Sequence, residues 1–181
     1  MGSRAVFIDR DDTILEDESY MSRVEQVRLI PGVSEALGRL QSTGLELVLI
    51  SNQSGVGRGW IAPGQVQAIE DRMCELLGLS FAASEYCFHR PDEACGCRKP
   101  SPAMILRAAE ALALDRRRSV MVGDKAKDVL AGEAAGCWTV LVSDDPEQRA
   151  ACQPDLTVSH LGDAVAWIEG RGMKYKTRNK E

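Results

Sequence analysis

The sequence predicts an α/β protein in which helices cover both faces of one parallel sheet, a three-layer, doubly wound, Rossmann-like arrangement. Two observations carry this prediction. Short apolar runs alternate with longer segments that have helical spacing, which is the pattern of βαβ units. Polar clusters follow three of the apolar runs. With 181 residues, the chain can bury one substantial core, so we expect a single domain over residues 1–170 and a basic tail over residues 171–181.

Each expected element has a local reason. The strands are short and mostly apolar runs, as in strands buried on both faces. The helices place apolar residues three and four positions apart, and two of them start at a proline, which the first helical position favours. The expected strands are residues 4–9, 45–50, 86–88, 119–122 and 138–142, and the expected helices are residues 33–40, 63–77, 102–112 and 125–135.

The polar clusters all fall at the carboxyl ends of strands. Residues 9–13 are Asp-Arg-Asp-Asp-Thr, residues 51–55 are Ser-Asn-Gln-Ser-Gly, and residues 123–125 are Gly-Asp-Lys. Because ligands of such sheets bind beyond the carboxyl ends of the strands, we expect these clusters to meet in one site.

The residue types at this edge suit phosphoryl transfer. A carboxylate such as Asp9 can attack phosphorus if a cation offsets the charge of both partners, and Asp9 with Asp124 offers oxygen ligands for Mg²⁺. Asp11 could carry the proton to the leaving oxygen and later take one from water. Donors for the phosphate are Ser51, Asn52 and Lys99. Taken singly, such residues are as often turn formers or solvated surface groups.

Four motifs resemble those of the haloacid dehalogenase (HAD) superfamily over about residues 4–145: Asp9-x-Asp11-x-Thr13, Ser51-Asn52, Lys99-Pro100 and Gly123-Asp124-x-x-x-Asp128. The resemblance implies a Mg²⁺-dependent phosphatase. It implies Asp9 as the nucleophile, Asp11 as the acid/base and a metal contact through its backbone carbonyl, Asp124 as a metal ligand and Asp128 as a supporting acid.

Asp12 departs from the family pattern, which usually has glycine at this position. The glycine is expected where the chain turns sharply after the catalytic pair, and aspartate tolerates the left-handed conformation better than most residues do. We therefore expect Asp12 to adopt that conformation, and hypothesise that its charge does not face the phosphate.

A second metal site is predicted from Cys87-x-His89-x₅-Cys95-x-Cys97. Three thiolates and one imidazole complete a tetrahedral zinc site without an open position, which indicates a structural role. The alternative is a chance cluster of buried thiols. Arg98 and Lys99 follow the last cysteine directly, so zinc would aim both cations at the phosphate.

The cysteine–histidine loop resembles a subfamily that holds heptose bisphosphate phosphatases and histidinol-phosphate phosphatases, both without a large cap domain. Ser54 favours the heptose branch, because the histidinol branch has aspartate there. The expected substrate-binding residues are Asp17, Tyr20, Ser51, Asn52, Gln53, Ser54, Arg58, Arg98, Lys99 and Lys125. Histidinol phosphate remains an alternative substrate, and a catalytically impaired phosphate-binding or zinc-scaffold module is an alternative from another class.

Composition limits the partners. The formal net charge of −5 disfavours non-specific binding to nucleic acid. No apolar run approaches the ~20 residues of a membrane-spanning helix. We expect a cytoplasmic monomer that acts on a small phosphorylated metabolite, with no nucleic-acid or membrane partner. Residues 171–181 hold five basic residues and one acidic residue, and we expect a disordered tail there.

Overall fold

The structure is a computed structural model that describes residues 2–16, 18–171 and 175–176. Most of the expected tail and Asp17 lie outside the described residues. In chain order the elements are β1 (Ala5–Ile8), the short η1 (Val24–Gln26), α1 (Val33–Ser42), β2 (Glu46–Asn52), α2 (Ser54–Gly57), α3 (Pro63–Leu77), β3 (Ala83–Cys87), α4 (Ala103–Ala111), the short η2 (Arg116–Arg118), β4 (Val120–Gly123), α5 (Ala126–Ala135), β5 (Trp138–Val142), α6 (Pro146–Ala150), β6 (Leu156–Val158) and α7 (Leu161–Arg171).

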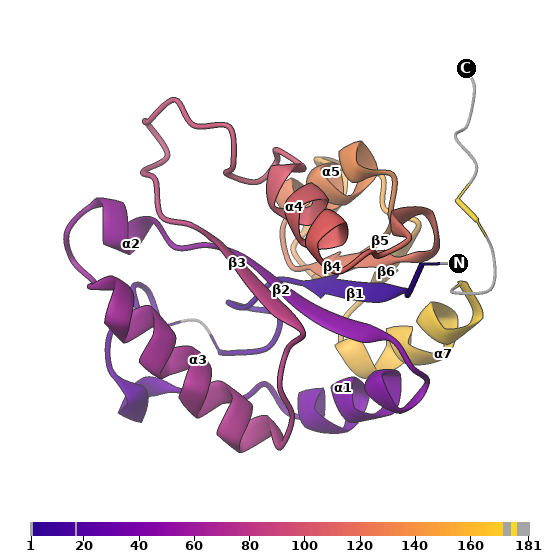
Figure 1. Cartoon of the computed structure of the whole chain (residues 1–181), viewed down its shortest axis with the longest axis horizontal. Coiled ribbons are helices and arrows are strands. Elements are labelled where there is room, and N and C mark those ends of the chain that lie inside the picture. Colours follow the sequence, from indigo (N-terminus) through magenta and orange to yellow (C-terminus); the bar gives the residue numbers. More distant parts are fainter. Residues whose placement is uncertain (1, 17, 172–174, 177–181) are drawn as a thin grey trace.

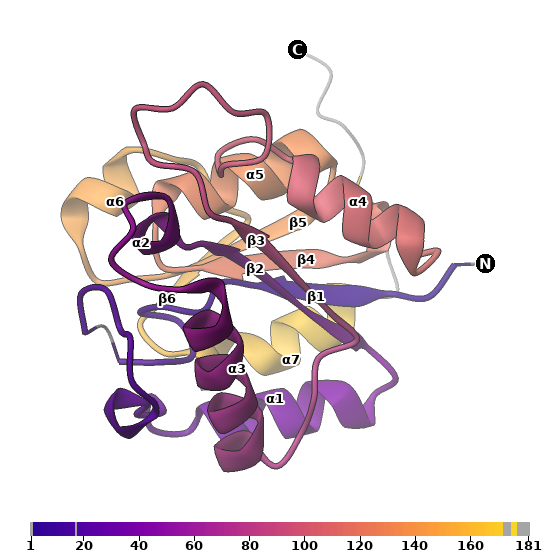
Figure 2. The same ribbon diagram turned by 60° about the vertical axis from the view of Figure 1, so that its left-hand side comes forward.

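The six strands form one sheet in the order β3-β2-β1-β4-β5-β6, and all neighbouring strands are parallel. Helices α4 and α5 cover one face, and α1, α3 and α7 cover the other (Figures 1 and 2). This confirms the predicted three-layer α/β fold. The bounds of α3 and β5 match the expected residues, whereas β3 begins three residues before the expected position, in the partly polar segment Ala83–Cys87.

Three elements near the C-terminus were not predicted: α6, β6 and α7. Helix α7 buries Leu161, Val165 and Ile168 against the face that α1 also covers. Arg39 of α1 and Glu169 of α7 form an ion pair at 2.7 Å. These elements add an edge strand and extend one helical layer without changing the site edge.

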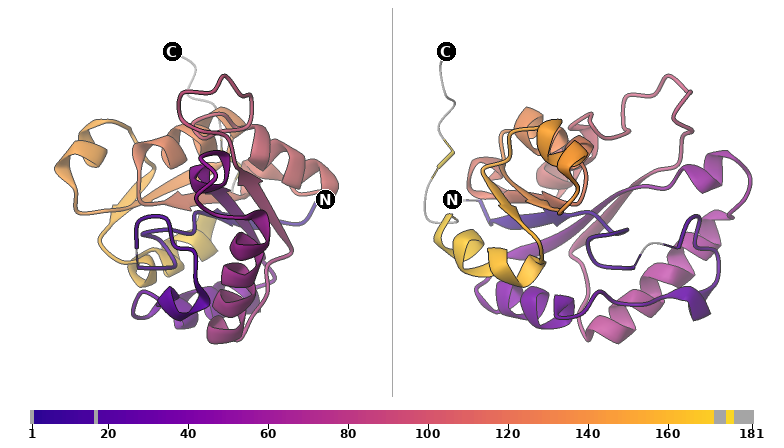
Figure 3. Two further views of the ribbon diagram at one scale, coloured as in Figure 1. Left: turned by 90° about the vertical axis from the view of Figure 1, so that its left-hand side faces the viewer. Right: turned by 180° about the vertical axis from the view of Figure 1, so that it is seen from behind.

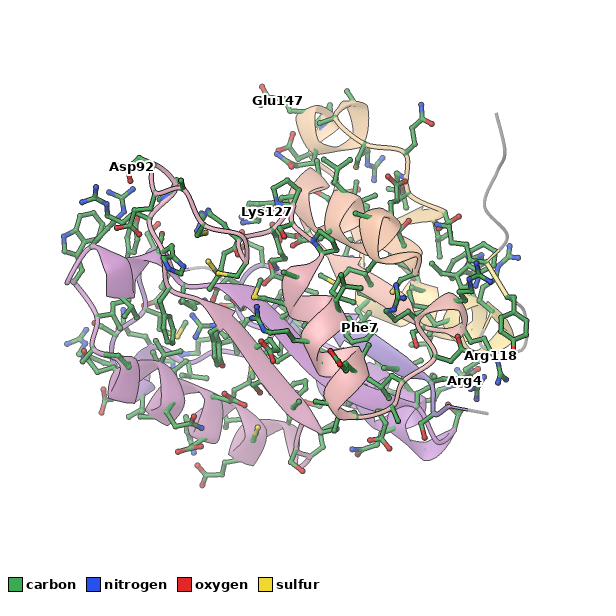
Figure 4. The ribbon with its side chains drawn as sticks, turned by 45° about the horizontal axis from the view of Figure 1, so that its top comes forward. Arg4, Phe7, Asp92, Arg118, Lys127 and Glu147 are labelled. Atoms are coloured by element: carbon green, nitrogen blue, oxygen red, sulfur yellow. The ribbon has the colours of Figure 1, made fainter. Side chains whose placement is uncertain are left out.

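Strand β1 shows how the core fixes the sheet between its two layers. All four of its side chains are fully buried. Val6 and Ile8 belong to the cluster under α1, α3 and α7, and Phe7 belongs to the cluster under α4 and α5 (Figure 4), because successive strand residues face opposite sides. Among the described residues, no helix combines the length and apolarity needed to cross a bilayer.

The carboxyl ends of β1, β2 and β4 meet at one edge of the sheet, which faces the viewer in Figure 3, left. The β3–α4 loop projects from this edge, with Asp92 near its outer end, and Lys127 lies near the start of α5 (Figure 4). Between β2 and β3 the chain forms only α2 and α3, and α3 packs into the core through Ile69 and Met73. In the described chain, no large cap domain covers this edge.

Candidate active site

Four charged residues form the buried floor of the site: Asp9, Lys99, Asp124 and Asp128, which are 5%, 2%, 7% and 0% exposed. The Lys99 ammonium lies 2.9 Å from Asp9 Oδ1 and 2.7 Å from Asp128 Oδ1, and it donates to the Ile50 carbonyl oxygen at 2.7 Å. Burial opposes ionisation of Asp9, but Lys99 and then Lys127 more than offset this, so the pKa of Asp9 lies below its ordinary value. Asp9 is thus kept as the carboxylate that a nucleophile requires.

Gly123 allows Asp128 to reach the floor. A Cβ atom at Gly123 would overlap the Asp128 side chain. Asp128 is in the first turn of α5, and its Oδ2 accepts the Lys125 backbone N–H at 3.1 Å, which satisfies one of the free donors at the helix start. The glycine of the fourth motif therefore has a steric reason.

Asp9, Asp124 and Asp128 can each offer a carboxylate oxygen to one metal, because these oxygens lie within 4.8 Å of one another. Asp124 Oδ1 is buried and has no hydrogen-bond partner among the described residues. Burial, followed by the charges of Asp9 and Asp128, raises the pKa of Asp124 to about 7. An unsatisfied oxygen within a group of repelling carboxylates suits a hard divalent cation.

Asp11 is held at the pocket by its neighbours. Arg10 Nε donates to Asp11 Oδ1 at 2.9 Å, and Gln53 Nε2 donates to Asp11 Oδ2 at 2.7 Å. The same Gln53 nitrogen donates to Ser51 Oγ at 2.8 Å. The first and second motifs are thus joined by side-chain hydrogen bonds.

Asn52 lines the pocket and is also bonded to the Lys99 backbone. Its Nδ2 donates to the Lys99 carbonyl oxygen at 3.2 Å, and its Oδ1 accepts the Lys99 N–H at 3.1 Å. The paired bonds tie the loop before α4 to the end of β2. The amide has a second proton and Asn52 lines the pocket, so its expected contact with phosphate stays a prediction beside this anchoring contact.

The rim of the pocket consists of Tyr20, Ser54, Arg98 and Lys127, which surround a space of about 250 Å³. The full lining is Arg10, Asp11, Glu18, Ser19, Tyr20, Met21, Asn52, Gln53, Ser54, Gly55, Arg98 and Lys127. Sequence analysis named Tyr20, Ser54 and Arg98 but missed Lys127. No hydrogen bond or ion pair of Lys127 is found in the part of the chain that the structure describes, so its ammonium is available to an anion.

Two other expected substrate cations already have partners within the protein, and neither lines the pocket. Lys125 Nζ lies 3.2 Å from Asp12 Oδ2 and 3.1 Å from Asp124 Oδ2. Arg58 is exposed and stacks 5.0 Å over the Trp60 ring, and Trp60 in turn packs edge-on against Tyr20 with ring centroids 4.5 Å apart. Arg58 therefore reaches the rim through Trp60 and Tyr20, not as a lining residue.

Asp12 has the left-handed conformation that sequence analysis expected, with φ of 58°. Its carboxylate pairs with Lys125, as described above. The observed contact agrees with the hypothesis that the Asp12 charge does not face the phosphate.

The four predicted zinc ligands come together at the base of the β3–α4 loop, within 4.8 Å of one another. Cys87 Sγ lies 3.8 Å from Cys95 Sγ and 3.6 Å from His89 Nδ1, and Cys97 Sγ lies 3.3 Å from His89 Nδ1. Tetrahedral ligands at Zn–S distances of about 2.3 Å would lie about 3.8 Å apart. The cluster therefore has both the ligand types and nearly the spacing that zinc requires.

A larger hollow, of about 830 Å³, lies at the opposite edge, beside the amino ends of β4, β5 and β6. Its charged lining is mixed: Asp115, Arg116, Arg117, Glu133, Asp155 and Lys176. The smaller pocket is lined by Asp11, Asn52 and Gln53 of the first two motifs, and Asn52 bonds to the backbone of Lys99 in the floor beneath it. These motif residues, rather than the larger volume, identify the smaller pocket as the candidate active site.

Comparisons with known proteins show the family of this chain. A family model described as HAD-hydrolase-like matches residues 96–164. The D-glycero-beta-D-manno-heptose-1,7-bisphosphate 7-phosphatase of Haemophilus ducreyi is 36% identical to this chain over 93% of the chain and 100% of that protein. The D-glycero-D-manno-heptose-1,7-bisphosphate 7-phosphatase of Thermosynechococcus vestitus is 37% identical over 91% and 94%. The chain therefore belongs to the HAD family of phosphatases.

A solved structure extends the similarity to the whole fold. The D,D-heptose 1,7-bisphosphate phosphatase from B. bronchiseptica, in complex with magnesium and phosphate, superposes with a TM-score of 0.83 at 29% identity, over 91% of this chain and 97% of that one. That protein binds both ions in a closely similar fold.

The structure shows contacts at the pocket for Arg10 and Gln53, and it places Lys127 in the pocket lining. Arg10 and Lys127 were not singled out, although both are cations within four residues of a motif aspartate, which was an available signal. Gln53 was expected to contact substrate, and its bonds to Asp11 and Ser51 depend on side-chain geometry that spacing does not reveal.

Proposed function

We propose that this chain removes the 7-phosphate of D-glycero-D-manno-heptose 1,7-bisphosphate through an aspartyl-phosphate intermediate. The observation that carries the class of reaction is the buried Asp9 carboxylate, which Lys99 and Lys127 keep ionised. Curated heptose bisphosphate phosphatases match this chain over 93% and 91% of its length, at 36% and 37% identity, and this similarity supports the substrate.

In the first step, Asp9 attacks phosphorus and the bond to the sugar oxygen breaks while Asp11 gives its proton to that oxygen. In the second step, a water molecule gives a proton to Asp11 and attacks the acyl phosphate. The bond between phosphorus and Asp9 then breaks, which releases inorganic phosphate and restores both carboxyl groups. Ser51 would donate to a phosphoryl oxygen, and the positive charge of Lys99 would offset charge on the phosphoryl group from the floor.

Asp9, Asp124 and the backbone carbonyl of Asp11 would hold Mg²⁺, with Asp128 in support, and the ion would supply positive charge where Asp9 and the phosphate meet. Cys87, His89, Cys95 and Cys97 would hold structural Zn²⁺. The zinc loop leads directly to Arg98, whose Nη1 donates to the His89 carbonyl oxygen at 3.3 Å, and to Lys99. Zinc would thereby fix one rim cation and one floor cation.

The rim supports a substrate with a second anionic group. Arg98 and Lys127 are both half-buried in the pocket lining, and Ser54 offers a hydroxyl suited to a polyol. Histidinol phosphate is the second candidate, since a related enzyme subfamily shares this loop; its amine would have to lie beside these two cations, which disfavours it.

The deciding experiment measures Mg²⁺-dependent phosphate release from D-glycero-D-manno-heptose 1,7-bisphosphate and from L-histidinol phosphate side by side, with Asp9→Asn as the control. We expect a kcat/KM at least roughly 100-fold higher for the heptose substrate. Preference for histidinol phosphate would refute the substrate but keep the mechanism. Failure with both substrates and with generic phosphate esters would refute the enzymatic function.

A further inference from the structure

A single amide nitrogen links the serine of the second motif to the acid/base carboxylate of the first. Gln53 Nε2 donates to Asp11 Oδ2 at 2.7 Å and to Ser51 Oγ at 2.8 Å. Gln53 is 6% exposed and Ser51 is 0% exposed, so water competes little for the bond between them, whereas the Asp11 side chain is 30% exposed. Both protons of the amide are committed to the site.

The backbone fixes Gln53 in this position. Ser51 and Gln53 are two residues apart at the end of β2, so their side chains lie on the same side of the extended chain, and that of Asn52 lies on the other. The Gln53 N–H donates to the Cys87 carbonyl oxygen at 2.8 Å. Gln53 is also the N-cap residue of α2.

The contact also orients Ser51. A hydroxyl group has one proton and can accept as well as donate. Because Ser51 Oγ accepts from Gln53, its own proton remains for another acceptor, and none is found for it in the described parts of the chain. A phosphoryl oxygen at the floor would be that acceptor.

Both carboxylate oxygens of Asp11 are held: Arg10 Nε donates to Oδ1 at 2.9 Å, and Oδ2 accepts from Gln53 Nε2 at 2.7 Å and from Arg10 Nη2 at 3.3 Å. We propose that Gln53 is a positioning residue, which aims Asp11 at the leaving oxygen and turns the Ser51 proton toward the phosphate. This inference rests on the proposed phosphatase mechanism and does not depend on which sugar is the substrate.

The nature of the leaving group separates this role from a structural one. An alkyl phosphate releases a poor leaving group, which needs the proton from Asp11 as the bond breaks. The nitrophenolate of p-nitrophenyl phosphate leaves without help. Misplacing Asp11 therefore slows the alkyl ester selectively, whereas a damaged phosphate site or a partly unfolded protein slows both esters alike.

The test compares kcat/KM for glycerol 3-phosphate and p-nitrophenyl phosphate in the wild type, Gln53→Met, Asp11→Asn and Ser51→Ala. Gln53→Met keeps the side-chain length and removes the donor. We expect it to lose roughly 30-fold more activity on the alkyl ester than on the aryl ester, in the same direction as Asp11→Asn. Ser51→Ala should slow both esters by similar factors.

A double variant and a second substitution complete the design. Adding Gln53→Met to Asp11→Asn should not change the alkyl-to-aryl ratio further, because Asp11 is the group that Gln53 acts through. Gln53→Glu, which faces Asp11 with an acceptor, should show the same selectivity if Gln53→Met fails to fold. Equal loss on both esters, or no loss, would overturn the inference. Wild-type turnover of p-nitrophenyl phosphate tests the phosphatase function separately.

Discussion

The floor and the rim of the pocket hold their charges in different ways. At the floor, Lys99 is 2% exposed and lies between two carboxylates. At the rim, Tyr20 is 45% exposed and Lys127 has no ion partner among the described residues. A buried charge must be compensated within the protein, whereas a half-exposed charge is solvated by water until a ligand binds. Substitutions at the floor should therefore affect chemistry and stability together, and those at the rim mainly substrate binding.

Lys99→Met should have the largest effect. It leaves Asp9 and Asp128 facing each other in the interior, so we expect kcat to fall at least about 1000-fold and the free energy of unfolding to fall by about 3–5 kcal/mol. Steady-state kinetics with p-nitrophenyl phosphate and urea unfolding measure the two effects. Lys127→Met is the matched control and should leave the free energy of unfolding within about 0.5 kcal/mol. A Lys99→Met variant with near-wild-type kcat would contradict the expectation that floor substitutions affect chemistry more than rim substitutions do.

Gly123→Ala should damage the floor without changing any charge. The added Cβ would overlap the Asp128 side chain, and the resulting displacement of Asp128 and Lys99 should lower kcat by roughly 100-fold. Gly38→Ala in α1 is the control, because its Cβ would meet nothing within 4 Å and alanine favours the helix. If both variants kept full kcat, close packing at Gly123 would not matter for catalysis.

Zinc removal tests the connection between floor and rim. Because the Cys–His cluster leads into Arg98 and Lys99, we expect the zinc-free protein to lose roughly tenfold in kcat/KM while its apparent affinity for Mg²⁺ stays the same. Metal analysis must show that zinc is absent, and Cys74→Ser, in α3 outside the cluster, controls for thiol loss. Full activity in a protein shown to lack zinc would refute the positioning role.

Lys127→Ala should expose the role of the rim. If its ammonium binds the phosphate that does not react, KM for the heptose bisphosphate should rise roughly tenfold with little change in kcat. KM for a heptose 7-monophosphate, which lacks the second phosphate, should change less than about threefold. Equal losses on both substrates would instead place Lys127 at the reacting phosphate, next to Asp9, whose pKa it helps to lower.

The sequence could predict the floor better than the rim for a physical reason. Asp9 and Asp124 directly follow strands, and the fold brings all strand ends to one edge, so their meeting follows from topology. The contacts of Lys127 and Gln53 depend on side-chain directions within loops and first helical turns, which spacing does not fix.

The elements show the same division. Helix α3 begins with a proline and has clear periodicity, and its bounds were predicted. Strand β6 has only three residues, too few for a period to be recognised. Helix α7 does carry helical spacing at Leu161, Val165 and Ile168, but the motifs that guided the prediction end before it.

Asp12→Gly should have the smallest effect. Glycine would relieve the left-handed backbone at φ of 58°, a gain of about 1 kcal/mol. It would also remove the contact with Lys125, where both side chains are more than a third exposed, so the loss should be no more than about 1 kcal/mol. We therefore expect the free energy of unfolding to change little, and kcat to change by less than about tenfold.

Asp12→Asn separates the two contributions, since asparagine tolerates the same backbone conformation and lacks the charge. If either variant were more than about tenfold faster, equal to ~1.4 kcal/mol in the barrier, the Asp12 charge would act on the phosphate. Comparing the two would then assign the gain: a faster Asp12→Asn variant would show that charge repulsion reaches the pocket, whereas a gain in Asp12→Gly alone would come from the backbone turn. In the first case, the ion pair with Lys125 would not shield the phosphate from the Asp12 charge. Asp12 would then belong to the charges that act on the phosphate, although it is less buried than the floor residues.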